Sequence, residues 1–172
     1  RSLQEVVDEG VRRAYNHPDN RLRASVLADP AFTRRNTRDN TPCVLRVDNG
    51  LRSVWLSGDL DAERETRLAL ARPDLRADVL LAPHHGSASS SSPVLLNTLQ
   101  PSWVLIQSGY RNRFHHPAPV VLDRYRERGL RWVNTPQCGA ATWRSAAPEA
   151  VHCERADDRH YWHHVGADEA MA

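Results

Sequence analysis

The sequence contains no lysine, so all 23 of its basic side chains are arginines, and 21 acidic residues nearly balance them. The net charge of +2 is too small to indicate nucleic-acid binding by itself. Cys43, Cys138 and Cys153 form no CxxC pair, so we expect neither a disulfide framework nor a zinc ribbon. No apolar run is long enough to cross a bilayer, and no signal-peptide pattern opens the chain. Because a helical pattern has already begun at Arg1, we expect a fragment of a larger protein.

Charge is distributed unevenly along the chain. Six arginines between residues 111 and 131 are accompanied by only two acidic residues, whereas residues 147–172 hold two arginines and six acidic residues. A basic patch of this kind suits a phosphate backbone, although a solvated helix face is the more common cause of such a run.

Strand and helix patterns alternate along most of the chain. An Asn-Gly pair separates the strand-like stretches 43–47 and 51–57, which predicts a hairpin closed by a type I′ turn. Ser92 followed by Pro93 predicts the start of a helix, and Gly129 predicts the end of another. The other predicted elements are helices over 3–15, 62–71, 94–100 and 118–128, and strands over 22–28, 77–82, 102–107, 130–135, 139–143 and in the tail. This alternation predicts an α/β fold, with helices covering a sheet that has some parallel pairing.

Small or polar residues follow each buried strand at once. Asp59 follows the first of these strands, His84 and His85 follow the next, and Ser108 and Thr135 follow the last two. The carboxyl ends of strands in an α/β sheet share one edge, where ligands bind, so we expect Asp59 and His84 to be neighbours. A carboxylate and an imidazole that converge in this way are ligands for a divalent cation such as Zn²⁺ or Mn²⁺.

Simpler interpretations stand beside this one. Gly-Asp after a strand is common in turns because the aspartate caps the following helix. His115 and His116 fit a polar loop, and Ser87 to Ser92 fit a flexible loop that ends in a helix cap. Two adjacent imidazoles at the exit of a buried strand are rarely packing residues, so His-His-Gly-Ser is the more specific signal. From the residues alone, the sequence indicates a metal-dependent hydrolase and nothing narrower.

Five motifs, in unbroken order over residues 36 to 144, resemble a known family. They are NTPCVLRV, LSGDLDAERETRL, ADVLLAPHHGSASSSS, SGYRNRFHHPAPVVLDRY and NTPQCGAATW. Together they are similar to the C-terminal metallo-β-lactamase-fold domain of ComEC-type competence DNA-uptake channel proteins. The resemblance implies a partial αβ/βα sandwich, with a mixed sheet and covering helices, for the single domain 1–172.

The resemblance also implies roles for particular residues. Asp59 and His84 match metal ligands, and His85, also expected to be catalytic, would face substrate phosphate or a second metal. His116 and Asn112 are expected to line the same cleft with a catalytic role. The residues expected to contact substrate are Ser87, Arg111 and Arg113. The implied chemistry is hydrolysis of DNA phosphodiesters by a two-metal Zn or Mn site, with no small-molecule cofactor.

The chain departs from the family pattern in one respect. The fold takes most of its metal ligands from an early His/Asp-x-His/Asp-x-Asp-His motif, and no such motif occurs here. We therefore expect the second half of the fold, inactive alone, which completes its site with the remainder of a parent inner-membrane protein. The implied location is the periplasmic face of that membrane, with DNA as the partner. Two other interpretations remain open: a catalytically inactive DNA-binding or channel-gating module, and a metallohydrolase for another substrate.

Overall fold

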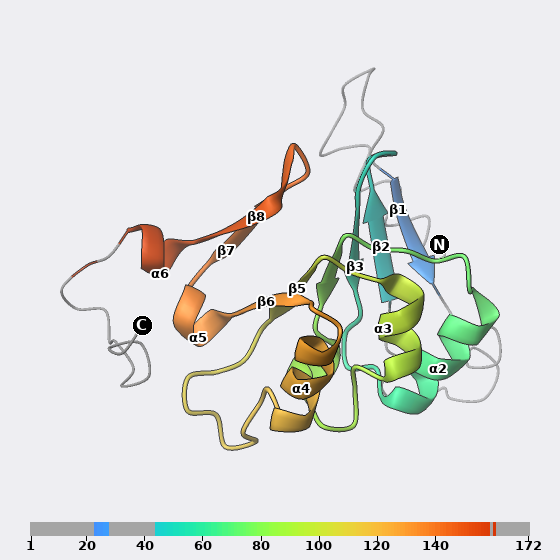
Figure 1. Ribbon diagram of the computed structural model, residues 1–172, viewed down its shortest axis with the longest axis horizontal. Helices are drawn as coiled ribbons and strands as arrows, with labels where there is room; N and C mark the ends of the chain where they lie inside the picture. Colours follow the sequence, from blue (N-terminus) through green and yellow to red (C-terminus); the bar gives the residue numbers. More distant parts are fainter. Residues whose placement is uncertain (1–22, 28–43, 159, 161–172) are drawn as a thin grey trace, which may run out of the picture.

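The computed structural model describes residues 23–27, 44–158 and 160, and a six-stranded sheet is its main feature (Figure 1). The strands lie in chain order across the sheet: β1 (Arg23–Leu27), β2 (Val44–Asp48), β3 (Ser53–Leu56), β4 (Val79–Leu81), β5 (Trp103–Ile106) and β6 (Arg131–Asn134). Strands β1 to β3 pair antiparallel and β3 to β6 pair parallel. The predicted mixed sheet is therefore confirmed, whereas the helix predicted over residues 3–15 lies outside the described residues.

The β2–β3 hairpin forms at the Asn-Gly pair, but its turn differs from the expected type. Asp48 pairs with Ser53, so the turn contains the four residues from Asn49 to Arg52. Of these four, only Gly50 has positive φ, at 83°, whereas a type I′ turn needs positive φ at both central residues. The Asn49 side-chain oxygen instead accepts the main-chain N–H groups of Leu51 and Arg52, at 3.1 and 2.9 Å. The asparagine side chain therefore closes the turn.

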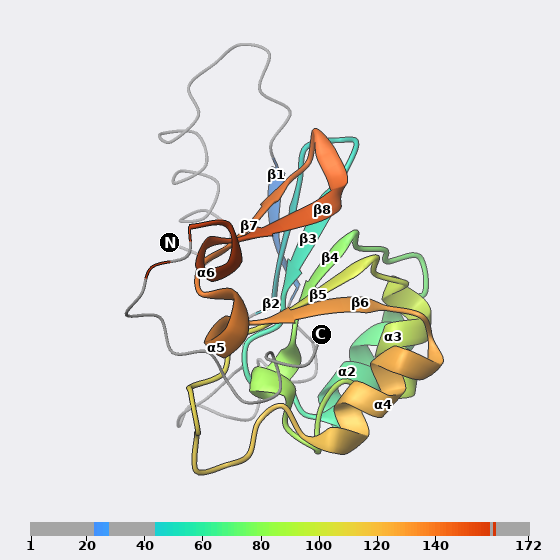
Figure 2. The same cartoon turned by 60° about the vertical axis from the view of Figure 1, so that its left-hand side comes forward.

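Three helices cover one face of the sheet: α2 (Ala62–Ala71), α3 (Pro93–Leu99) and α4 (Pro119–Glu127) (Figure 2). Trp55, Leu80 and Val104 are neighbours across β3, β4 and β5, and all three are fully buried. Residues in register on adjacent strands point to the same face, so this apolar row is where the helices pack. The main core of the domain therefore lies between the parallel strands and the three helices.

The ends of the helices follow the predicted capping residues. The Ser92 hydroxyl accepts the main-chain N–H of Leu95 at 3.2 Å, which confirms the predicted start of α3. Gly129, with φ of 63°, follows the end of α4. Its N–H donates to the Arg126 carbonyl at 3.0 Å and the N–H of Leu130 donates to Tyr125, also at 3.0 Å. This pair of bonds is the Schellman arrangement that glycine favours at helix ends.

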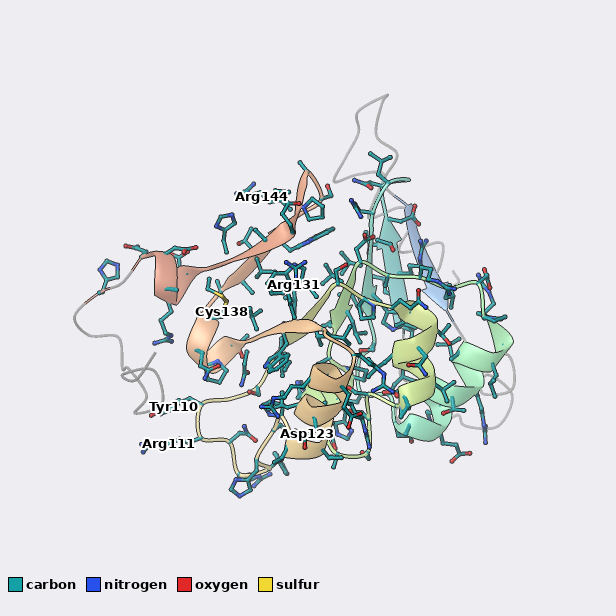
Figure 3. The ribbon with its side chains drawn as sticks, in the orientation of Figure 1. Tyr110, Arg111, Asp123, Arg131, Cys138 and Arg144 are labelled. Atoms are coloured by element: carbon teal, nitrogen blue, oxygen red, sulfur yellow. A yellow bond between two sulfur atoms is a disulfide. The ribbon has the colours of Figure 1, made fainter. Side chains whose placement is uncertain are left out.

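A second, two-stranded sheet follows the main one, and it contains a disulfide. After α5 (Thr135–Cys138), strands β7 (Ala141–Arg144) and β8 (Ala147–Cys153) pair antiparallel, and α6 (Glu154–Asp157) follows. Ala141 pairs with Cys153 in this register, and Cys138 and Cys153 form a disulfide with a Cα–Cα distance of 4.5 Å (Figure 3). The expectation that the cysteines form no disulfide framework is therefore wrong, because the register of the β7–β8 hairpin brings Cys153 beside the segment that follows Cys138.

Candidate functional site

Three histidines and an aspartate meet where the parallel strands end. Asp59 follows β3, His84 and His85 lie in the short 3-10 helix η1 (Pro83–Gly86) after β4, and His116 lies in the loop after β5. The Nε2 atom of His85 lies 3.7 Å from Oδ1 of Asp59. The rings of His84 and His116 meet edge to face, with their centres 6.1 Å apart. The predicted convergence at this edge is confirmed, with His85 rather than His84 opposite the Asp59 carboxylate.

The backbone of η1 adopts a conformation that few side chains tolerate. His84, His85 and Gly86 have φ values of 49°, 57° and 80°, all in the left-handed region. Left-handed backbone costs about 1–2 kcal/mol per non-glycine residue. The His84 N–H donates to the Gly58 carbonyl at 2.9 Å, and the Ala118 N–H donates to the Gly86 carbonyl at 2.8 Å. Contacts to two other strand-end loops therefore hold this turn, as is typical of strained backbone at functional sites.

Gly86 allows η1 to lie against the loop that contains His116. A Cβ at this position would be 2.8 Å from the Cβ of Pro117 and 3.1 Å from its Cα. Real carbon atoms do not approach so closely, so only glycine fits between the two segments. The close contact explains why His84 and His116, which are far apart in the sequence, share one edge.

The tautomer of His85 follows from its hydrogen bond. Its Nδ1 lies 2.8 Å from the Gln107 carbonyl oxygen, which can only accept. In the neutral ring Nδ1 therefore holds the proton and Nε2 presents a lone pair toward Asp59. Zn²⁺ lies about 2.0–2.2 Å from imidazole nitrogen and carboxylate oxygen. The separation of 3.7 Å between His85 Nε2 and Asp59 Oδ1 therefore suits two ligands of one cation.

His84 and His116 each have a ring nitrogen without a hydrogen-bond partner. Their Nδ1 atoms are buried and accept or donate no bond among the described residues. An unpaired buried polar atom costs about 1–3 kcal/mol, so both atoms favour a bound partner. Burial lowers the pKa of His116 below its usual value, and the nearby His84 and His85 lower it further. A lowered pKa favours the neutral imidazole, which is the form that binds a metal.

Asn112 supports His116 from within the same loop. Its Nδ2 donates to the His116 carbonyl at 2.7 Å and to the Gly109 carbonyl at 3.0 Å. Its Oδ1 accepts the His116 N–H at 2.9 Å. All of these partners are main-chain groups of the loop itself. The geometry therefore gives the Asn112 side chain a positioning function, and its predicted catalytic role stays a prediction.

The residues predicted to contact substrate lie around the histidines. The Ser87 hydroxyl lies 3.1 Å from that of Ser89 at the end of η1. Arg111 and Arg113 are exposed on the loop between β5 and α4. Arg111 lies on the outer bend of that loop (Figure 3). The other four arginines of the basic run have structural contacts: Arg124 with the Ser90 carbonyl, Arg126 with Asp123, Arg128 with Asn97 and Arg131 with the Glu149 carbonyl. The run is therefore not one continuous basic face.

A buried polar cluster that the sequence did not predict lies behind the serine tract. Glu65 of α2 is fully buried, and its two oxygens accept the main-chain N–H groups of Ser91 and Ser92 at 2.7 and 2.5 Å. The Ser91 hydroxyl lies 2.7 Å from the Tyr125 hydroxyl, and burial raises the pKa of Tyr125 to about 12. The sequence does contain a signal for this cluster: Glu65 shares a helix face with the apolar residues Leu68 and Ala69, three and four positions further on. Most of the serines predicted to be plain loop thus have buried partners.

Two negative findings apply to residues 23–27, 44–158 and 160. This part of the chain contains no group of three or more His, Cys, Asp or Glu side chains arranged to hold a metal ion. Within it, no helix has the length and apolar character needed to cross a membrane.

The fold and site define a mixed α/β domain with imidazole and carboxylate groups at the carboxyl edge of its parallel strands. The chain is 35% identical over 116 residues to ComE operon protein 3 of Bacillus subtilis, which covers 67% of the chain. It is 39% identical over 109 residues, 62% of the chain, to competence protein ComA of Neisseria gonorrhoeae. It is 40% identical over 82 residues, 48% of the chain, to recombination protein 2 of Haemophilus influenzae. Over about 60% of its length the chain is thus homologous to proteins of the ComEC family, which confirms the resemblance of its motifs.

Each match covers only part of this chain and a small part of the relative. The matched segments span only 14%, 16% and 10% of the three relatives' own lengths. A family model described as fumarate hydratase (Fumerase) matches residues 1–53, a part of the chain that contains none of the site residues.

Proposed function

We propose that this chain provides one part of a divalent-metal site that hydrolyses DNA phosphodiesters within a ComEC-type DNA-uptake protein. The observation that supports it most directly is the pair formed by Asp59 Oδ1 and His85 Nε2 at 3.7 Å, beside the unpartnered Nδ1 atoms of His84 and His116. One of the similar proteins is named a competence protein, and competence is the uptake of DNA. Its name supports DNA as the substrate of this chain.

The residues present fit a Zn²⁺ or Mn²⁺ ion by their chemistry. Neutral imidazole and carboxylate are ligands that both cations accept. A two-metal site activates a water at neutral pH and stabilises the attacking and leaving oxygens of the phosphodiester. Asp59 and His85 would bind a cation, with His84 as the further predicted ligand. The remaining ligands then come from parts of the parent protein outside the described residues.

The disulfide supports the proposed location of this domain. Disulfides form and persist in oxidising compartments such as the periplasm and are rare in the cytosol. The Cys138–Cys153 bond therefore favours a position outside the cytoplasm. We propose that the parent protein lies in the bacterial inner membrane and that this domain faces the periplasm.

A nuclease assay on the parent protein tests the catalytic proposal. Asp59→Asn keeps the size of the side chain and removes its charge, so Mn²⁺- or Zn²⁺-dependent cleavage should fall at least about a hundredfold, because the site loses a metal ligand. Binding of DNA should persist. Asp74→Asn is the matched control, because Asp74 is exposed in the turn before β4, where its partner is Arg72. Unchanged cleavage by Asp59→Asn would remove the carboxylate from the mechanism.

The second candidate function is a DNA-binding or channel-gating module without catalysis. The lack of a three-ligand group in the described residues favours it. The same assay separates the two functions, because an inactive module binds DNA with no metal-dependent cleavage by either the unmodified parent protein or its variants.

A further inference from the structure

Two aromatic rings are exposed on the loop between β5 and α4. The exposed fraction is 56% for Tyr110 and 62% for Phe114. Each ring has an arginine over it: the guanidinium carbon of Arg111 lies 5.2 Å from the Tyr110 ring centre, and that of Arg113 lies 4.7 Å from the Phe114 ring centre. We call residues 110–114 the aromatic–arginine loop. It contains two exposed aromatic side chains and two cations within five residues.

The loop is held in place rather than free. Asn112, its central residue, points inward and has the three main-chain hydrogen bonds described above. The His115 N–H also donates to the Asn112 carbonyl at 3.1 Å. Figure 3 shows Tyr110 and Arg111 on the outer bend of the loop, directed away from the sheet. A loop that is fixed before binding loses less conformational entropy when a ligand orders on it.

The aromatic–arginine loop continues directly into the histidine edge. Phe114 stacks on His116, with ring centres 5.7 Å apart and ring planes inclined by 19°. His116 in turn meets His84. A base that stacks on the opposite face of Phe114 would therefore lie one ring away from His116, beside the candidate site.

We propose that the aromatic–arginine loop binds single-stranded DNA by stacking unpaired bases on Tyr110 and Phe114, and so selects single strands over duplex for the adjacent site. This inference rests on the proposed function in taking DNA as the ligand. In a duplex the base faces are covered by neighbouring base pairs, so exposed rings have nothing to stack on. Unpaired bases offer those faces whatever their sequence, and arginines between the rings attract the phosphates. The alternation of aromatic and basic residues therefore favours a single strand.

The test measures binding of a labelled oligodeoxynucleotide, alone or annealed to its complement, by fluorescence anisotropy in buffer without divalent metal. Tyr110→Ala and Phe114→Ala should each weaken single-strand binding by about 5- to 100-fold and change duplex binding by less than about twofold. Tyr110→Trp keeps a stacking face and should retain the affinity. Arg111→Ala should weaken binding of both forms and reduce the salt dependence by about one phosphate contact. Leu70→Ala, at a 70% exposed apolar residue of α2, is the control and should change neither form.

The outcomes distinguish this inference from the function on which it rests. If the unmodified chain binds neither form of DNA, the proposed DNA substrate is wrong. If it binds DNA but prefers duplex, or if the alanine variants lose both forms equally, the stacking proposal alone is overturned. A parent protein that lacks nuclease activity while this selective loss is observed contradicts the catalytic proposal and supports the loop's preference for single strands.

Discussion

Replacing Glu65 with glutamine should destabilise the fold, because only a carboxylate can accept both of the hydrogen bonds made at this position. The main-chain N–H groups of Ser91 and Ser92 donate to different oxygens of Glu65, at 2.7 and 2.5 Å. Glutamine accepts one of them and turns its own NH₂ group toward the other, which leaves buried donors unpaired. That loss costs about 1–3 kcal/mol. For a chain of this size, each kcal/mol lowers the Tm by about 2–4 °C.

Thermal and urea unfolding of the purified chain measure this effect. Glu63→Gln, on the same helix, is the matched control, because Glu63 is exposed and loses only its ion pair with Arg67. Such a pair contributes about 0.2–0.5 kcal/mol. Glu65→Ala removes both acceptors and should be the least stable of the three variants. Equal Tm values for the two glutamine variants would contradict the role given to the Glu65 carboxylate.

Comparison of the wild type with Glu65→Gln also predicts how stability changes with pH. Burial raises the pKa of Glu65 above its ordinary value of 4.5, in spite of its hydrogen bonds to Ser92 and Ser91. The folded chain therefore binds this proton more tightly than the unfolded chain does. The contribution of this tighter proton binding to the free energy of unfolding is fully present below pH 4.5, and it is lost as pH rises through the raised pKa of Glu65. Desolvation of the charge sets this sign and outweighs the two hydrogen bonds, which by themselves would favour the carboxylate. The unfolding free energy of the wild type should therefore fall over that window relative to that of Glu65→Gln, which does not titrate at this position, and a relative rise would refute the sign.

Two further predictions concern the turn at Gly86 and the disulfide. Gly86→Ala places a Cβ 2.8 Å from that of Pro117 and also puts a side chain on left-handed backbone, so the free energy of unfolding should fall by about 2–5 kcal/mol. The new Cβ in Gly129→Ala has no atom within 4 Å, so only the left-handed backbone is unfavourable there. The free energy of unfolding, measured in urea, should therefore fall by about 1–2 kcal/mol. Reduction of the Cys138–Cys153 bond, which links residues 15 positions apart, should lower stability by about 3 kcal/mol. A reductant should therefore lower the Tm of the wild type but not that of Cys138→Ser, and an equal response of both proteins would contradict this.

The sequence predicts best the elements whose signals are local. Helix α2 spans Ala62–Ala71, the range predicted from the sequence, and Asp61 caps it by accepting the Arg64 N–H at 3.0 Å. The caps at Ser92 and Gly129 depend on neighbours within a few residues, and both are confirmed. The convergence of Asp59, His84 and His85 was also predictable, because parallel strands impose a shared edge whatever the details of packing.

The features that the sequence does not reveal depend on strand register, on contacts between distant segments or on backbone conformation. The disulfide requires the register of the β7–β8 hairpin, and nothing in the spacing of Cys138 and Cys153 indicates that register. The buried part of the serine tract requires Glu65 from a different helix. The partner of Asp59 depends on the backbone of η1: because the chain turns through left-handed conformations at both histidines, it is His85 that meets the carboxylate. Such a conformation leaves no pattern in the sequence.

The buried cluster around Glu65 and the left-handed turn at His84 and His85 are connected through the serine tract. Three of the serines after this turn are fixed by hydrogen bonds. Ser90 Oγ donates to the Pro83 carbonyl at 2.7 Å, and the main-chain N–H groups of Ser91 and Ser92 donate to Glu65. Each such bond contributes about 0.5–1.5 kcal/mol net, whereas left-handed backbone costs about 1–2 kcal/mol at each of His84, His85 and Ser91. The hydrogen bonds of the serine tract therefore offset part of this strain, and the imidazoles are positioned by the protein itself. This explains why three serines of a segment with the pattern of a polar loop are buried.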